Sequence, residues 1–282
     1  MKFVRFGESG SEKPGLLNGD GEIFDISGKL GDLSGESLSP ETLASFADID
    51  FSTLRMVPKS TRLGPCVSET GKFICIGLNY ADHAAETGAT IPSEPIVFMK
   101  ATSAICGPND HVYIPRHSEK TDWEVELAFV IGKSGKYIRQ SEAINHIAGY
   151  FVANDVSERS FQTEREGQWT KGKSCDRFGP IGPWLVTTDE VNDPQNLSLW
   201  LKVNGELMQN GSTKTMIFGV AHLVCYLSQF MTLHAGDIVS TGTPPGVGMG
   251  KSPQKFLQDG DQVELGIEGL GEQKQNYMND PD

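Results

Sequence analysis

The chain has little positive charge and no long apolar run. Its 24 Lys and Arg residues face 37 Asp and Glu residues, giving a formal net charge of -13 at pH 7. Such a field repels nucleic-acid phosphates and anionic membranes, so neither kind of partner is expected. A membrane-spanning helix would need about 20 apolar residues in succession, and the sequence has no such window. A small anionic substrate remains compatible with the sequence if a local cation offsets the long-range repulsion.

Cysteines and targeting signals are also scarce. The five cysteines, Cys66, Cys75, Cys106, Cys175 and Cys225, are odd in number, widely spaced and never arranged as CxxC. This pattern favours reduced thiols over a disulfide framework. The N-terminal sequence MKFVRFGESG reaches glycine and charge before any signal-peptide core forms. We therefore expect a cytoplasmic protein.

The first part of the chain predicts a small N-terminal β domain over residues 1–68. It contains two strand-like runs, KFVRF and EIFDIS, with the turn-forming sequence NGDG between them. Residues 56–71 are rich in Pro, Gly, Ser and Thr and lack apolar periodicity, which is typical of a boundary. The larger domain is predicted to cover residues 69–282.

The larger domain predicts many strands and few helices. One amphipathic helix is expected over residues 216–231 and a short one over YADHAAE. Turns of Gly, Pro and Asn separate the strands without regular βαβ alternation, so a mixed α/β, β-rich fold with a rolled or barrel-like core is favoured over a doubly wound sheet. The predicted strands are residues 73–79, 95–100, 123–132, 148–155, 199–207, 237–242 and 262–269.

Two carboxylates are predicted to share one face of the strand at 123–132. Because side chains alternate along a strand, Glu124 and Glu126 point the same way. Like charges on one face raise each other's pKa unless a cation lies between them, as in oxygen-rich Mg2+, Mn2+ or Ca2+ sites. The alternative is a solvated strand edge, which the apolar Ala128 and Val130 on the same face make less attractive.

Asp155 is a candidate third carboxylate because it ends the next apolar strand, AGYFVAND. It would join the first two if those strands are neighbours. The same residue fits a different role, since Asp155 and Glu158 have the spacing of a capping box at the start of a helix. The sequence leaves these two roles open.

His83 and Glu86 lie three residues apart and therefore share one face of a helix. A carboxylate beside an imidazole suits general-base chemistry, and a solvated surface pair is the alternative.

Residues 167–174 (GQWTKGKS) match the P-loop pattern, yet no apolar strand precedes them and Gly and Pro follow, so a nucleotide site is not expected. Lys173 remains a candidate buried cation. The sequence TGTPPGVGMG at 241–250 forms either a simple turn or a backbone contact with an anion.

Six sequence segments in order resemble the fumarylacetoacetate hydrolase family across residues 73–269. They are GLNYADHAAE, SEPIVFMK, DWEVELAFVIG, NDVSERSFQ, GKSCD with GPIGPW, and STGTPPGVGMG. The resemblance implies a mixed β-sandwich roll with a small N-terminal β domain, a homodimer, and a bound Mg2+ or Mn2+, with Ca2+ as a further option. Within the family the chain looks most like 2,4-diketo-3-deoxy-L-rhamnonate or L-fuconate hydrolases, a branch often labelled ureidoglycolate lyase.

The resemblance also implies roles for individual residues. Glu124, Glu126 and Asp155 match the metal ligands, and His83, Glu86 and Lys173 match catalytic groups, the first two on a mobile lid. Arg159, Gln162 and Thr243 match substrate-binding positions. The implied reaction is metal-dependent hydrolysis of a C–C bond in a 2,4-dioxo acid, giving pyruvate and a second acid. Oxaloacetate decarboxylation, keto-enol isomerisation or ureidoglycolate lyase activity at the same site is the alternative.

Overall fold

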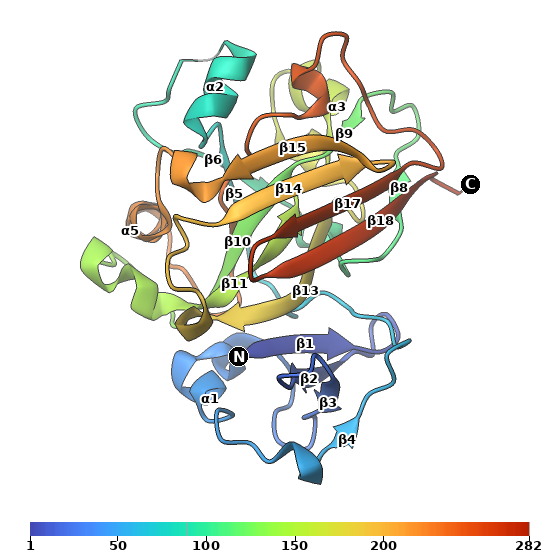
Figure 1. Ribbon diagram of the computed structural model, residues 1–282. Coiled ribbons are helices and arrows are strands. Elements are labelled where there is room, and N and C mark those ends of the chain that lie inside the picture. Colours follow the sequence, from blue (N-terminus) through green and yellow to red (C-terminus); the bar gives the residue numbers. More distant parts are fainter. Residues whose placement is uncertain (89, 282) are drawn as a thin grey trace.

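A large twisted β-sheet forms the frame of the molecule in the computed structural model, which describes residues 1–88 and 90–281 (Figure 1). Neighbouring strands in it are mostly antiparallel, and β16 and β5 are parallel. Its strands in spatial order are β4 (Arg55–Met56), β3 (Ile23–Asp25), β2 (Lys13–Leu17), β1 (Lys2–Phe6), β13 (Gly179–Thr187), β11 (Ile147–Asn154), β10 (Val125–Ile131), β16 (Ile238–Ser240), β5 (Phe73–Gly77) and β6 (Ile96–Lys100), with β7 (Ile105–Cys106) paired to β13.

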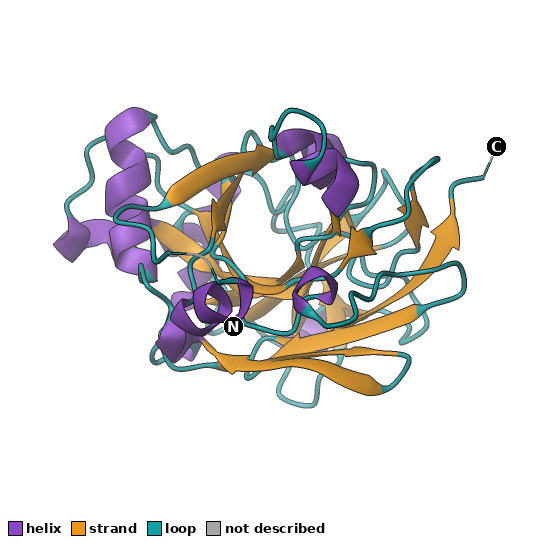
Figure 2. Ribbon diagram, turned by 90° about the horizontal axis from the view of Figure 1, so that it is seen from above, coloured by secondary structure: helices purple, strands orange, loops and turns teal. Residues whose placement is uncertain are grey.

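A second sheet packs against the first, so the strands enclose the core and the helices lie outside (Figure 2). Its strands are β15 (Glu206–Ser212), β14 (Ser198–Val203), β17 (Gln262–Ile267), β18 (Gly271–Asn279) and β8 (Val112–Ile114), and β9 (Thr121–Asp122) pairs separately with β12 (Ser157–Glu158). The helices are α1 (Pro40–Ala44), α2 (Ala81–Thr87), α3 (Arg159–Thr163), α4 (Thr170–Lys173) and α5 (Val220–Phe230). This confirms the predicted β-rich mixed α/β fold.

Strand β10 separates two apolar cores because its side chains alternate between its two faces. Leu127 and Phe129 belong to the cluster between the sheets, whereas Ala128 and Val130 pack on the opposite face with residues from the N-terminal strands. All four are fully buried. The predicted alternation is therefore confirmed, and it leaves the face that carries Glu124 and Glu126 directed away from the inter-sheet core.

The N-terminal strands continue the large sheet. Strand β1 pairs antiparallel with β13, and Phe3 lies opposite Leu185. The sequence predicts that NGDG joins KFVRF to EIFDIS in a hairpin. In the structure NGDG joins β2 to β3, and β2 is a strand that the sequence does not predict, because Gly15 and Pro14 weaken its strand pattern. In Figure 1 the blue N-terminal elements lie beside β13. The domain boundary after residue 68 stays a prediction.

Two other sequence predictions need correction. Residues 199–207, predicted as one strand, form the hairpin β14–β15, because Asn204 and Gly205 adopt φ values of 51° and 79° at its turn. The helix predicted from residue 216 begins at Val220. Asn79 holds the residues just before this helix in a non-helical conformation. Its backbone oxygen accepts from Ile217 N at 2.8 Å, and its side-chain oxygen accepts from Phe218 N at 2.8 Å.

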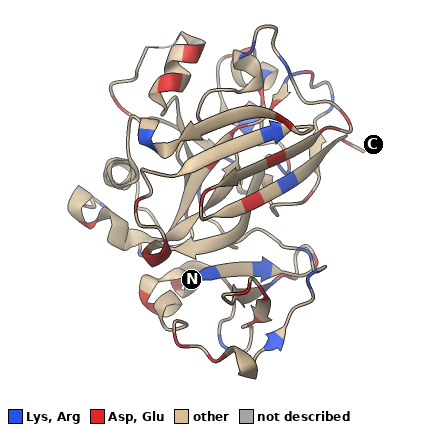
Figure 3. Cartoon of the chain, in the orientation of Figure 1, with Lys and Arg blue, Asp and Glu red and all other residues tan. Residues whose placement is uncertain are grey.

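Charged residues of both signs are interspersed over the elements drawn in Figure 3, where α2 carries acidic positions. All five cysteines are free thiols, as the spacing predicted. Among the described residues, no helix is long and apolar enough to cross a bilayer.

Candidate metal and substrate site

Three carboxylates from two neighbouring strands meet at one point. Glu124 precedes β10, Glu126 lies within it, and Asp155 follows β11. The two strands pair antiparallel, and Asp155 N donates to Glu124 O at 2.9 Å, which fixes the third residue beside the first. One oxygen from each carboxylate lies within 4.8 Å of the others, and all three residues are buried. Oxygen donors in this arrangement suit a hard divalent cation.

Asp155 takes no part in capping the following helix. Glu158 is the N-cap of α3 and accepts from Ser160 N at 3.1 Å. Both oxygens of Asp155 instead face lysines, with Lys100 Nζ at 2.5 Å from one and Lys173 Nζ at 2.7 Å from the other. The capping-box interpretation is therefore wrong for Asp155, and the interpretation that places it with the other carboxylates fits the geometry.

Basic side chains only partly neutralise the cluster. Lys173 Nζ also lies 2.7 Å from Glu124 Oε2, and Arg159 bridges Glu124 and Asp122 at 2.7 and 2.9 Å. The charged groups of this cluster, all of them buried, are the carboxylates of Asp122, Glu124, Glu126 and Asp155 and the cations of Lys100, Arg159 and Lys173. One formal negative charge is therefore in excess. A divalent cation would reverse that sign and leave the site attractive to a carboxylate substrate.

The two glutamates respond differently to their surroundings. Burial raises the pKa of Glu126 well above its usual value, and the charges of Asp155 and Glu124 raise it further. Burial also acts to raise the pKa of Glu124, but the nearby Lys173 and Arg159 outweigh it and hold that pKa below the usual value. Ser240 Oγ and Gly242 N donate to Glu126 at 2.5 and 2.9 Å, so the side chain is fixed although its charge is poorly compensated.

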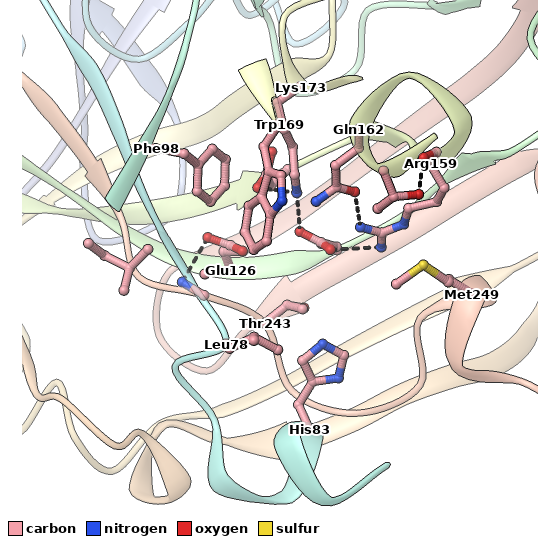
Figure 4. A pocket seen from close by; sticks show the side chains of 16 residues that line it. Leu78, His83, Phe98, Glu126, Arg159, Gln162, Trp169, Lys173, Thr243 and Met249 are labelled. Carbon is pink, nitrogen blue, oxygen red and sulfur yellow. Dashed lines mark hydrogen bonds and ion pairs between the residues drawn. The ribbon is translucent and has the colours of Figure 1, made fainter. Parts of the chain in front are cut away.

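A cavity of about 240 Å³ opens on this cluster (Figure 4). Figure 4 shows His83 facing it from α2, across from Lys173 and Gln162. The cavity is lined by Ile76, Gly77, Leu78, His83, Phe98, Glu124, Glu126, Asp155, Arg159, Gln162, Thr163, Trp169, Lys173, Gly242, Thr243 and Met249. The structure thus brings every sequence-predicted site residue except Glu86 to the cavity wall.

Glu86 lies behind His83. The Nδ1 atom of His83 is 3.1 Å from Glu86 Oε2, and Glu86 Oε1 accepts from Gly246 N at 3.0 Å. His83 is only 7% exposed, so the surface-pair alternative does not describe it. The carboxylate can orient the imidazole, and it also holds α2 against the turn at residues 246–250.

The three predicted substrate-binding residues differ in the hydrogen-bond donors that they still offer to a ligand. Arg159 donates to Gln162 Oε1 at 3.0 Å, which turns the amide nitrogen of Gln162 away from the guanidinium. The Thr243 hydroxyl donates to Val125 O and accepts from Gln209 Nε2, both at 2.8 Å. Gln162 therefore keeps donors for a ligand, whereas the Thr243 hydroxyl proton already serves the scaffold.

Lys173 lies in the four-residue helix α4, and its ammonium group faces carboxylates. Helix α3 precedes this segment, so the strand that a phosphate-binding loop requires is missing there. The P-loop match is coincidental, as the flanking sequence indicated.

Two buried residues of the site were not recognised from the sequence. Lys100 ends β6 and donates to Val156 O at 3.0 Å as well as pairing with Asp155. Asp122 accepts from Gly248 N at 2.7 Å and from Met249 N at 2.9 Å, and it pairs with Arg159. Asp122 therefore ties the guanidinium at the cluster to the turn that supports Glu86.

Replacing Asp122 by Asn is expected to lower the free energy of unfolding by about 3 kcal/mol, because it removes one of the two carboxylates that pair with the buried Arg159 charge and places an amide N–H against backbone donors. Urea denaturation of the metal-free protein measures this. Asp20→Asn, in the exposed β2–β3 turn, is the matched control. A change of less than about 0.5 kcal/mol, the size usual for surface positions, would contradict the role given to Asp122.

Comparison with known proteins places these features in one family of sequences. Residues 72–276 match the model described as the fumarylacetoacetate (FAA) hydrolase C-terminal region. A Burkholderia lata protein provisionally named a hydrolase is 58% identical over 277 residues, which is 98% of each chain.

Solved structures show the same fold over the whole chain. A fumarylacetoacetate hydrolase from Exiguobacterium antarcticum has a TM-score of 0.87 and 36% identity, covering 99% of this chain and 100% of that one. A 2-hydroxyhepta-2,4-diene-1,7-dioate isomerase from Mycobacterium marinum has a TM-score of 0.80 and 31% identity, with both chains fully covered. A maleylpyruvate hydrolase from Sphingobium sp. SYK-6, in complex with manganese(II) and pyruvate, has a TM-score of 0.83 and 28% identity, again with both chains fully covered.

Proposed function

The chain belongs to the fumarylacetoacetate hydrolase family, and we propose that it is a divalent-metal-dependent hydrolase that cleaves the C–C bond of a 2,4-dioxo acid. The products would be pyruvate and a second carboxylic acid. The observation that carries this proposal is one cavity whose wall joins a buried carboxylate cluster to the His83 side of a His–Glu pair. A hydrolase needs both parts, because one stabilises the departing carbon fragment and the other activates water.

Glu124, Glu126 and Asp155 are the proposed ligands of Mg2+ or Mn2+, with Ca2+ as a further option. They fit such an ion because three buried oxygen donors converge and their charge exceeds that of the neighbouring cations. A cation bound there would supply the positive charge that binds the 2-oxo carboxylate and stabilises negative charge developing on the keto oxygen. The manganese and pyruvate of the Sphingobium enzyme support the same combination of ion and product here.

The chain's own residues would handle water and the distal carbonyl. His83, oriented by Glu86, takes a proton from water, and the resulting hydroxide adds to C4. The amide nitrogen of Gln162 and the ammonium group of Lys173 donate to the oxyanion formed at C4. The C3–C4 bond then breaks, its electron pair goes to C3, and protonation of C3 completes pyruvate while C4 leaves as a carboxylic acid.

Within this class we propose a 2,4-diketo-3-deoxy sugar acid as the substrate, on the resemblance to rhamnonate and fuconate branch enzymes. A homodimer is proposed on the same resemblance, and the particle mass in solution checks it. Isomerisation or oxaloacetate decarboxylation is the second candidate, supported by the likeness to the Mycobacterium marinum isomerase and by the fact that neither reaction needs an attacking water. Ureidoglycolate lyase activity is a further alternative.

Incubation of the protein and Mn2+ with acetylpyruvate and, separately, with oxaloacetate distinguishes these reactions. Hydrolysis predicts equal amounts of pyruvate and acetate from the first compound, at a rate that falls to background after chelation of the metal. Carbon dioxide from oxaloacetate together with intact acetylpyruvate would reject hydrolysis in favour of decarboxylation. Enol–keto exchange of acetylpyruvate without cleavage would favour the isomerase.

A further inference from the structure

The Lys and Arg side chains of the cavity wall lie at one place. Among the described lining residues, the Lys and Arg side chains are Lys173 and Arg159, and both pair with Glu124. Each also pairs with a second carboxylate, Asp155 or Asp122. Their charge is thus already paired with carboxylates of the cluster, where the carboxylate and keto groups of a 2-oxo acid would bind.

The rest of the wall is formed mainly by large apolar side chains. These are Ile76, Leu78, Phe98, Trp169 and Met249, as Figure 4 shows for the last four. Phe98 and Trp169 pack edge to face, with ring centroids 5.3 Å apart. A Cβ atom at Gly77 would lie 2.5 Å from the indole, so the glycine makes room for Trp169 at this position. The aromatic wall is therefore a built feature, held by packing.

From these two observations we infer that the acyl group beyond C4 of the substrate is uncharged and ends in an apolar group that packs against the wall of Leu78, Trp169 and Met249. This inference rests on the proposed function and narrows its substrate class. A second carboxylate in that position would lose its hydration without meeting a Lys or Arg side chain other than the two already paired with carboxylates, which is unfavourable. An apolar end would instead exclude water from the wall.

The inference separates this chain from two proteins that share its fold. The named substrates of the Sphingobium hydrolase and the Mycobacterium marinum isomerase, maleylpyruvate and a 1,7-dioate, each carry a second carboxylate. An enzyme for such acids needs a cation at the far end of the substrate. The described wall of this cavity offers no Lys or Arg side chain beyond the two at the carboxylate cluster.

A series of three acylpyruvates of nearly equal size tests the inference. Their acyl groups are succinyl, its terminal amide, and 4-methylpentanoyl, which replace a carboxylate by a carboxamide and then by an isopropyl group. With the full chain and Mn2+, the expected kcat/KM is highest for 4-methylpentanoylpyruvate and at least about 100-fold lower for succinylpyruvate, because an unpaired charge is costly in a desolvated site. The amide is expected between them.

Two variants locate the effect in the wall. Met249→Lys should lower the ratio of kcat/KM for the isopropyl compound to kcat/KM for the carboxylate compound by about 10-fold or more, since it adds a counter-charge to the cavity. Met278→Lys, at a position 42% exposed on β18, adds the same charge outside the cavity and should leave the preference unchanged.

The results distinguish this inference from the proposed function. Equal or faster cleavage of succinylpyruvate by the wild-type protein would overturn the inference and leave hydrolysis standing. Failure to release pyruvate from all three compounds would overturn the proposed function and the inference with it. A preference that Met278→Lys changes as much as Met249→Lys would remove the wall as its cause.

Discussion

Replacing Glu126 by Gln is expected to weaken Mn2+ binding by at least about 100-fold while leaving the metal-free protein as stable as the wild type or more stable. Burial and the charges of Asp155 and Glu124 oppose ionisation of Glu126, so its pKa is raised. A neutral amide removes that repulsion, and its oxygen can still accept from Ser240 and Gly242, which now donate to the carboxylate. The substitution therefore separates cation binding from folding.

The sign of the pH dependence follows from the same raised pKa. The folded, metal-free protein keeps a proton on Glu126 at pH values where an unfolded chain, with an ordinary Glu pKa near 4.5, has released it. The contribution of this group to stability is therefore fully present below that value and is lost as pH rises through the raised folded pKa. Glu126→Gln should lack this loss. Because cation binding displaces the proton, wild-type affinity for Mn2+ should increase with pH.

Calorimetric titration with Mn2+ and thermal unfolding with and without the metal measure both halves of the prediction. The control is Glu272→Gln, an exposed residue on β18 that should change neither affinity nor stability. Unchanged Mn2+ affinity in Glu126→Gln would remove this residue from the metal site. A large loss of metal-free stability would instead show that its ionised form supports the fold.

Local sequence rules predicted the faces of β10 but not its neighbours. Alternation requires only that the segment be a strand, so Glu124 and Glu126 could be assigned to one face from the sequence. The position of Asp155 beside them depends on the pairing of β10 with β11, which is a tertiary choice. The sequence alone therefore fitted Asp155 both as a metal ligand and as a helix cap, and the strand pairing places it beside the two glutamates.

Lys100 and Asp122 were missed because their local signals are ordinary. A lone lysine at the end of an apolar strand is usually solvated, and an aspartate beside a charged run looks like part of an exposed face. Their burial depends on partners 55 and 37 residues away in the chain, Asp155 and Arg159. By contrast, the β14–β15 hairpin could have been found, since Asn204-Gly205 is a strong turn signal.

Replacing His83 by Ala is expected to slow hydrolysis of acetylpyruvate by about 1000-fold, within the range usual for loss of a general base. Mn2+ affinity should change little, because none of the proposed metal ligands is on α2. Any oxaloacetate decarboxylation should also persist, since that reaction would need the cation held by the carboxylate cluster and no attacking water. The ratio of the two activities, measured on the same metal-loaded sample, is the informative quantity.

The Glu86→Gln variant tests whether Glu86 makes His83 a better base or only holds α2 in place. The amide keeps the size of the side chain and its oxygen can still accept from Gly246 N, but it withdraws the negative charge that lies 3.1 Å from His83 Nδ1. If Glu86 acts by making His83 a better base, hydrolysis should fall by roughly 10- to 100-fold with KM nearly unchanged. If it only holds α2 against the turn, Glu86→Gln should retain near-wild-type kcat. His146→Ala, at a half-buried histidine outside the cavity that is bonded to Lys133 O, controls for loss of an imidazole elsewhere and should leave both activities unchanged. Equal losses of hydrolysis and decarboxylation in His83→Ala would show that His83 serves the carboxylate cluster rather than the attacking water.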